Sequence, residues 1–197
     1  MDVLKAIETR RSNGLVSDKP VPEELLEKVL EAGTWAPNHH RTEPWRYFVL
    51  TGTAREPLGE VLAEITAKEM EDPESETNKK KLERVKANPF RAPVIIAVGV
   101  EPSEKSRVMA KEEHAAVYAS IQNMLLAAHS LGLGVFWRTG EACYNTRINE
   151  LFGLSEKGEM LAFLYLGYPK KEMPAGKRKH YSEVTTWIKD KGFFHKA

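Results

Sequence analysis

The feature that most constrains the fold is a continuous apolar run at residues 93–100, Pro-Val-Ile-Ile-Ala-Val-Gly-Val. Its β-branched residues favour a strand, and the lack of alternation between polar and apolar residues predicts that both faces of this strand are buried. The run therefore predicts the central strand of a covered sheet.

Helical and strand-like patterns alternate on both sides of this run, and 197 residues are enough for one core. No internal repeat, low-complexity segment or linker divides the chain, so we expect a single domain over residues 1–197. The other expected strands are 45–51, 135–138 and 160–166, and the expected helices are 2–9, 23–34, 54–70 with its start near Pro57, 110–131 and 145–152.

Residues 72–86 are almost all charged, with lysines and glutamates interleaved and only Leu82 and Val85 apolar. Such a pattern is typical of a solvent-exposed helix or a mobile excursion. A lid over a binding site is the functional alternative.

The charge balance argues against a nucleic-acid partner, because 29 basic and 28 acidic residues leave a net charge of only +1. The single cysteine, Cys143, cannot form an internal disulfide, and we expect a buried thiol rather than a nucleophile. No signal-peptide pattern or membrane-length apolar run is present, so we expect a cytoplasmic protein without a membrane partner.

Metal and nucleotide motifs are also lacking. The six histidines include the adjacent pair His39 and His40 but show no metal-ligand spacing, so no metal site is predicted. Gly132 and Gly134 follow a predicted helix and precede a strand, which is the reverse of the order in a Rossmann turn.

Four separated segments remain as candidates for a site: residues 10–12, 38–45, 137–140 and 177–179. Arg10, Arg11 and Ser12 follow the first predicted helix and could bind an anion or simply cap that helix as a solvated turn. Residues 36–45, Ala-Pro-Asn-His-His-Arg-Thr-Glu-Pro-Trp, form a proline-bounded loop between a helix and a strand, where ligand-binding side chains are often presented.

Several motifs in one order resemble the nitroreductase family of FMN-dependent oxidoreductases, and especially its small bacterial members. The resemblance covers essentially the whole chain. The motifs are Arg-Arg-Ser at 10–12, Ala-Pro at 36–37, Pro-Trp at 44–45, Leu-Gly-Leu-Gly at 131–134, Trp-Arg-Thr-Gly at 137–140 and Phe-Leu-Tyr-Leu-Gly-Tyr-Pro at 163–169.

The resemblance implies an α+β fold with a central, mostly antiparallel sheet flanked by helices. It also implies a homodimer with two FMN sites at the interface, in which the C-terminal tail of each subunit is swapped onto the other. The partner would then cover Trp187, Phe193 and Phe194, which are otherwise liabilities on a surface.

The resemblance further assigns cofactor-binding positions and no acid–base dyad of the protein's own. Trp137, Arg138 and Thr139 match the strand end beside the isoalloxazine ring. The other positions are Arg10, Arg11 and Ser12 with Arg178 and Lys179 at the phosphate or ribityl chain, and His39 with Trp35 near the flavin.

The implied activity is a ping-pong reaction in which NADH or NADPH reduces FMN and a small oxidant, such as a nitroaromatic or a quinone, is then reduced. The alternatives are a flavin-binding regulator and an FMN-processing family member without nitroreductase turnover. A flavin that the protein does not hold at all would favour a plain interaction domain.

This sequence departs from the family pattern at two places. Gly14 stands where many members carry a basic residue beside flavin N1 and O2, and Arg138 or His39 are the candidate substitutes. Arg41 or Thr42 and Glu43 stand where an asparagine and a glutamine commonly precede Pro-Trp.

Overall fold

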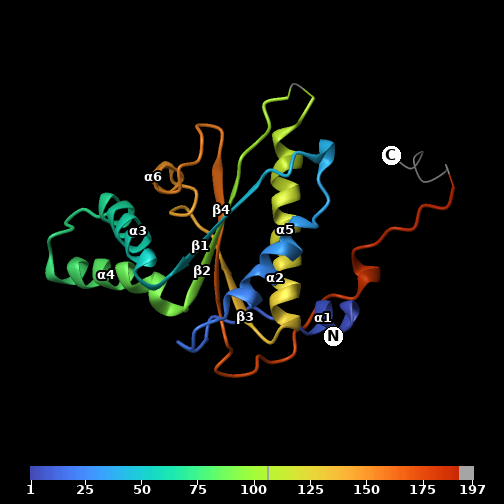
Figure 1. Ribbon diagram of the computed structural model, residues 1–197, viewed down its shortest axis with the longest axis horizontal. Helices are drawn as coiled ribbons and strands as arrows, with labels where there is room; N and C mark the ends of the chain where they lie inside the picture. Colours follow the sequence, from blue (N-terminus) through green and yellow to red (C-terminus); the bar gives the residue numbers. More distant parts are fainter. Residues whose placement is uncertain (106, 191–197) are drawn as a thin grey trace.

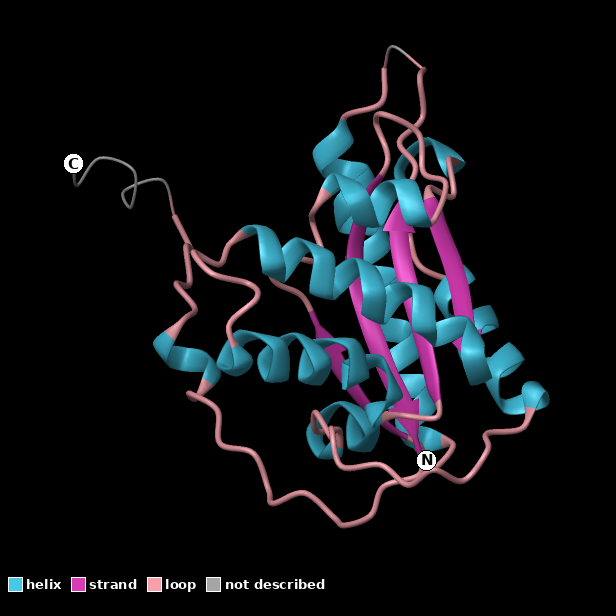
Figure 2. Ribbon diagram, turned by 90° about the vertical axis from the view of Figure 1, so that its left-hand side faces the viewer, coloured by secondary structure: helices cyan, strands magenta, loops and turns pink. Residues whose placement is uncertain are grey.

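The computed structural model describes residues 1–105 and 107–190, and its centre is a four-stranded sheet covered by helices on both faces (Figures 1 and 2). All three strand pairs are antiparallel, in the order β1-β2-β4-β3, which confirms the α+β class. The strands are β1 (Trp45–Thr51), β2 (Val94–Val100), β3 (Gly134–Arg138) and β4 (Glu159–Gly167).

β2 lies between β1 and β4, and all seven of its residues are buried, as the apolar run predicts. Its successive side chains point to opposite faces of the sheet. Ile96 and Val98 belong to the core cluster under one layer of helices, whereas Ile95 and Ala97 belong to the cluster under the other layer. This one strand therefore contributes side chains to both halves of the hydrophobic core.

One face of the sheet is covered by α2 (Glu23–Thr34) and by the long α5 (Ala110–Ser130), which pack against each other (Figure 1). Small residues permit this packing: a Cβ on Gly33 would lie 2.9 Å from side-chain atoms of both Met124 and Ser120. Pro22 precedes α2, and two glutamates in its first turn suit the positive end of the helix dipole.

The opposite face is covered by α3 (Glu56–Lys68) and α6 (Thr146–Leu151), with α4 (Glu76–Ala87) packed on the outside of α3. A Cβ on Gly59 would meet the Lys86 carbonyl oxygen at 2.3 Å, so α3 and α4 approach as closely as a glycine allows. None of the residues of α4 is buried, which matches the exposed helix expected for 72–86.

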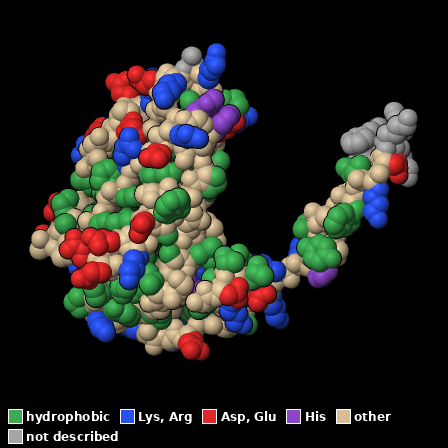
Figure 3. All heavy atoms as spheres, turned by 45° about the vertical axis from the view of Figure 1, so that its right-hand side comes forward, with side chains coloured by type: hydrophobic (Ala, Val, Ile, Leu, Met, Phe, Trp, Pro, Cys, Tyr) green, Lys and Arg blue, Asp and Glu red, His purple; other side chains and the backbone are tan. Residues whose placement is uncertain are grey.

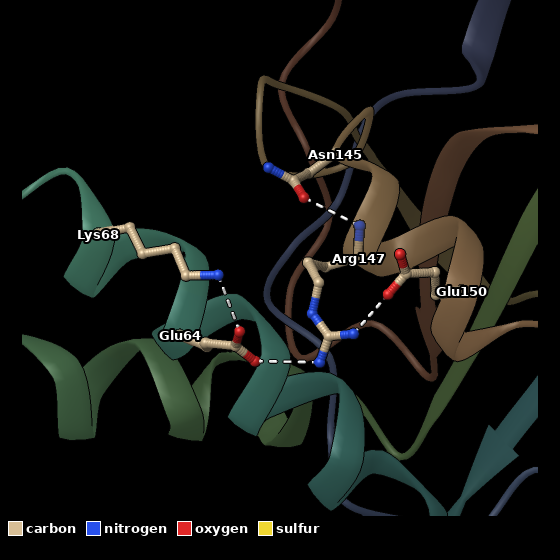
Figure 4. A network of polar contacts seen from close by, with 5 residues as sticks. All are labelled: Glu64, Lys68, Asn145, Arg147 and Glu150. Carbon is tan, nitrogen blue, oxygen red and sulfur yellow. Dashed lines mark hydrogen bonds and ion pairs between the residues drawn. The ribbon is translucent and has the colours of Figure 1, made fainter.

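A small polar network joins α3 to α6 at the surface (Figure 4). Arg147 donates to Glu64 at 3.3 Å and also pairs with Glu150, while Lys68 binds Glu64 at 3.0 Å. The Asn145 side chain caps α6 by accepting from the Arg147 backbone N–H at 3.0 Å. Because these groups are exposed, the ion pairs add little stability and mainly fix how α6 sits on α3.

The N-terminal segment occupies part of the free edge of β3. After α1 (Val3–Thr9), the backbone N–H of Asn13 donates to the Val135 carbonyl at 2.9 Å, and Ser12 forms a parallel bridge with the same residue. On α1 only Ala6 is buried, and the face carrying Val3, Leu4 and Ile7 is exposed.

The chain beyond β4 forms an exposed tail that projects from the body (Figure 1), and the space-filling view shows a hollow between the tail and the body (Figure 3). Its only regular structure among the described residues is the 3-10 turn η4 (Tyr181–Glu183). Trp187 is 74% exposed and Val184 is 73% exposed, so one chain alone does not cover them. Phe193 and Phe194 lie outside the described residues.

Candidate functional site

Three arginines from opposite ends of the chain form an uncompensated cationic cluster. The pKa of Arg10 is lowered, first by burial and then by the nearby charges of Arg11 and Arg178. In the described part of the chain, none of these guanidinium groups forms an ion pair with a carboxylate. Such a cluster favours an anion, and guanidinium geometry suits a phosphate.

Arg11 is fixed between the N-terminal segment and the tail. Its Nη1 donates to the carbonyls of Glu8 at 2.7 Å and Arg10 at 2.6 Å. The tail crosses it at Gly176, where a Cβ would lie 2.7 Å from the Arg11 Cζ. The buried Nε of Arg11 has no partner among the described residues, which leaves one donor available to a ligand.

The other predicted phosphate residues differ in their placement. Ser12 is exposed at its bridge to Val135, next to the arginines in the chain. Lys179 is exposed on the tail beside Arg178. His129, at the C-terminal end of α5, accepts or donates a hydrogen bond with Thr9 Oγ1 at 2.8 Å, and burial together with the charges of Arg10 and Arg11 lowers its pKa.

A cavity of about 310 Å³ lies at the end of β3 and shares Asn13 and Lys171 with a neighbouring cavity of about 450 Å³ that Arg11 lines. Gly14 and Phe136 form one wall, and a Cβ on Gly14 would already touch Phe136 at 3.4 Å. Arg138 lies 5.4 Å from the ring centre of Tyr165, in a cation–π arrangement. Among the described residues, the cavity is lined by three cationic side chains, Arg91, Arg138 and Lys171, and by no carboxylate.

Asn13 is a residue that the sequence did not single out, although it follows Ser12 directly. It is 5% exposed; its Nδ2 donates to the Lys171 carbonyl at 3.1 Å, and its Oδ1 accepts from the Leu15 N–H at 3.0 Å. Asn13 therefore ties the N-terminal segment to the start of the tail and shapes the wall of the cavity.

Trp137 and Thr139 lie on either side of Arg138. Trp137 packs against the core under α5, with its ring centre 6.0 Å from that of Tyr118, and its buried Nε1 has no partner in the described residues. Thr139 is exposed and lines a second cavity of about 170 Å³ that also contacts α3 and α4 through Thr66 and Val85. Val85 is thus the side chain through which the charged helix α4 lines this cavity.

The loop before β1 is held at the opposite end of α5. His39 Nδ1 lies 2.7 Å from Glu112 Oε2, and Thr42 Oγ1 donates to Glu113 Oε1 at 2.5 Å. Glu113 is fully buried, and its Oε2 accepts from the Ser103 N–H at 3.0 Å. Trp35, at the end of α2, is 79% exposed.

The predicted cofactor residues therefore fall into two groups. Arg10 and Arg11 lie close enough to His129, in the last turn of α5, for their charges to lower its pKa. His39 instead contacts Glu112, in the first turn of α5. These two helix positions are about 25 Å apart at the α-helical rise per residue. A single chain does not bring His39 to the arginine cluster.

Comparison with known proteins identifies this architecture. The model of the nitroreductase family matches residues 7–168. The chain belongs to the nitroreductase family. Its relatives include YdjA of Escherichia coli (strain K12), named as a candidate NAD(P)H nitroreductase, which is 32% identical over 170 residues, 86% of this chain and 90% of YdjA.

Solved structures of the family agree with the fold. A nitroreductase-like family protein from Bacillus cereus has a TM-score of 0.81 at 28% identity, covering 96% of this chain and 97% of that one. A nitroreductase candidate from Desulfovibrio desulfuricans, solved in complex with FMN, has a TM-score of 0.71 at 26% identity and covers 96% and 98% of the two chains. None of the helices described in our structure combines the length and apolar character that a membrane crossing needs.

One further pair at the first turns of α5 gives a pH-dependent prediction. His114 Nδ1 lies 2.7 Å from the Ala110 carbonyl oxygen and Nε2 lies 2.9 Å from Glu159 Oε2. Burial alone lowers the pKa of His114, but these two acceptors outweigh it, and the pKa is raised. Both ring nitrogens face acceptors, which stabilises the imidazolium relative to the neutral ring.

The pKa of His114 is higher in the folded state than in the unfolded state. Its protonated ring therefore adds fully to the free energy of unfolding at pH values below the unfolded-state pKa. This stabilisation is lost as the pH rises through the folded-state pKa. We expect the free energy of unfolding to fall by up to about 1 kcal/mol as pH rises from about 6 to 8, with screening at the partly exposed Glu159 limiting the size. Urea denaturation measures it. His114→Gln removes this decrease and the tail variant His180→Gln retains it; an equal pH dependence in both variants contradicts the assignment.

Proposed function

We propose that this protein is an FMN-dependent oxidoreductase that uses NADH or NADPH to reduce small electron acceptors such as nitroaromatics or quinones. The uncompensated cluster of Arg10, Arg11 and Arg178 is the observation that supports this best, because it suits the phosphate of FMN. Membership of the nitroreductase family and the FMN complex of the Desulfovibrio desulfuricans relative support the same cofactor.

The residues present fit the cofactor. The buried, unpaired Nε of Arg11 supplies a donor for a phosphate oxygen, and the exposed hydroxyl of Ser12 lies next to it in the chain. When bound, FMN supplies hydride and electron transfer. The end of β3 at Arg138 and Thr139 would then offer backbone N–H groups to the ring edge.

Positive charge beside the ring stabilises a reduced flavin, because reduction places negative charge near N1 and O2. Gly14 offers no side chain for this purpose. Arg138 and Arg91 line the cavity that Gly14 leaves open, and we assign that role to Arg138. The reductant and the oxidant would bind in turn at one place, as a ping-pong mechanism requires.

The complete site would need a homodimer. His39 lies about 25 Å along α5 from the region of the arginine cluster, so it can serve a flavin only if that flavin is held by a second copy. The apolar face of α1 and the exposed side chains of Val184 and Trp187 supply surface that such a partner would cover. A tail swapped between subunits would place these groups in the interface.

The activity is tested with purified protein incubated with FMN and freed of excess flavin. We expect a yellow protein whose flavin is bleached by NADH or NADPH without oxygen, and whose colour returns on adding a quinone. A protein that stays colourless contradicts the proposal. A flavin that binds but is not reduced by either nucleotide indicates a regulator instead.

The phosphate site is tested by Arg11→Met, which keeps much of the apolar stem and removes the guanidinium. We expect the dissociation constant of FMN to rise about 10- to 100-fold, as for loss of a charged hydrogen bond. Fluorescence titration of the flavin-free protein measures it, with Arg84→Met on α4 as the control. An unchanged dissociation constant in a folded Arg11→Met protein would remove Arg11 from the site.

The dimer is tested by Trp187→Ser. A buried tryptophan in an interface commonly contributes at least about 2 kcal/mol, so the dimer dissociation constant should rise roughly 30-fold or more. Sedimentation equilibrium over a concentration series measures it, and Lys189→Ser on the same tail is the matched control. Equal association of the two variants would show that Trp187 is outside the interface.

A further inference from the structure

The loop before β1 holds three left-handed residues, none of which is a glycine. His40, Arg41 and Glu43 have φ values of 59°, 51° and 49°. This conformation is costly for residues that carry a Cβ, and glycine adopts it freely. Three such residues within four positions are a concentration of strain that requires a structural or functional reason.

The surrounding structure enforces this conformation. Thr42 lies between the left-handed residues and donates to the fully buried Glu113, which also holds the Ser103 N–H. The backbone N–H of Glu43 donates to Asn38 Oδ1 at 3.1 Å. Thr42 therefore ties the loop to α5, the bond between Glu43 and Asn38 closes the loop on itself, and the carboxylate of Glu113 accepts from two separate segments.

The loop places Arg41 at the surface beside two histidines. The rings of His39 and His40 stack at 3.9 Å with an angle of 19° between their planes. Arg41 is exposed, and among the described residues its guanidinium has no hydrogen-bond or ion-pair partner. In the space-filling view, histidine side chains lie next to Lys or Arg side chains at one end of the body, near the opening of the hollow (Figure 3).

We propose that the strained loop presents Arg41 to an anionic group on a small molecule that reacts at the flavin, and that Thr42 and Glu113 position it. The inference rests on the proposed function, because His39 of the same loop is then a neighbour of the flavin held by the second copy. The anionic group is either the 2′-phosphate that distinguishes NADPH from NADH or a carboxylate or sulfonate carried by the oxidant. Both present oxygen anions to a guanidinium.

The chain offers an unusually direct test, since glycine fits the backbone at position 41 without strain. Arg41→Gly removes the guanidinium and keeps the loop conformation, and it should unfold at the same or a higher temperature than wild type. Glu43→Gly relieves the same strain two positions away and removes a negative charge instead. The two variants separate the effect of charge from the effect of backbone strain.

The experiment measures kcat/KM for the FMN-loaded proteins in two arms. One arm compares NADPH with NADH at a fixed neutral quinone, and the other compares a sulfonated with a neutral quinone at fixed NADH. For Arg41→Gly we expect the preference for the charged ligand to fall about tenfold in one arm, which identifies the source of the anion. For Glu43→Gly we expect that preference to remain or to increase.

The outcomes distinguish this inference from the proposed function. Wild-type turnover with unchanged preferences in both arms for Arg41→Gly overturns the role of Arg41 and leaves the oxidoreductase proposal standing. An equal decrease of the preference for the charged ligand in Arg41→Gly and Glu43→Gly also overturns the role of Arg41, because the backbone conformation would then be the cause. A wild-type protein that holds FMN but has no turnover overturns both.

Discussion

The structure depends on a strand that has no polar face. Because every side chain of β2 is buried, the chain must provide strands on both of its edges and helices over both faces of the sheet. The 21 residues of α5 span one face, and the length of this helix sets the spacing of everything attached to its ends. The arginine cluster gathers near its last turn and the strained loop is tied to its first turns.

The two ends of α5 (Ala110–Ser130) have opposite charges nearby, and both arrangements agree with the helix dipole. Glu112 and Glu113 lie in the first turn, where negative charge is favourable, and each binds a side chain of the loop before β1. Near the last turn, where positive charge is favourable, burial and then the charges of Arg10 and Arg11 lower the pKa of His129. Carboxylates order one end, and the other end keeps an excess of positive charge.

Much of the fold could be predicted from the residues, since the four strands lie within about one residue of the apolar patterns that indicate them. The antiparallel direction came only from the family resemblance, because a strand buried on both faces has the same pattern in either direction. The grouping of Arg11 with Arg178 was likewise implied by resemblance. The bond from Thr42 to Glu113 and the left-handed backbone were missed, because the two residues are 71 positions apart and no glycine marks the turn.

The repulsion among Arg10, Arg11 and Arg178 makes the stability of the folded protein depend on a bound anion. Without an anion, the folded chain carries a cluster of like charges that the unfolded chain separates, so the empty form is the less stable one. A ligand present at about 100 times its dissociation constant stabilises the folded state by about 2.7 kcal/mol. The supply of the phosphate-bearing ligand would then set both how much active protein exists and how long each newly made chain survives proteolysis.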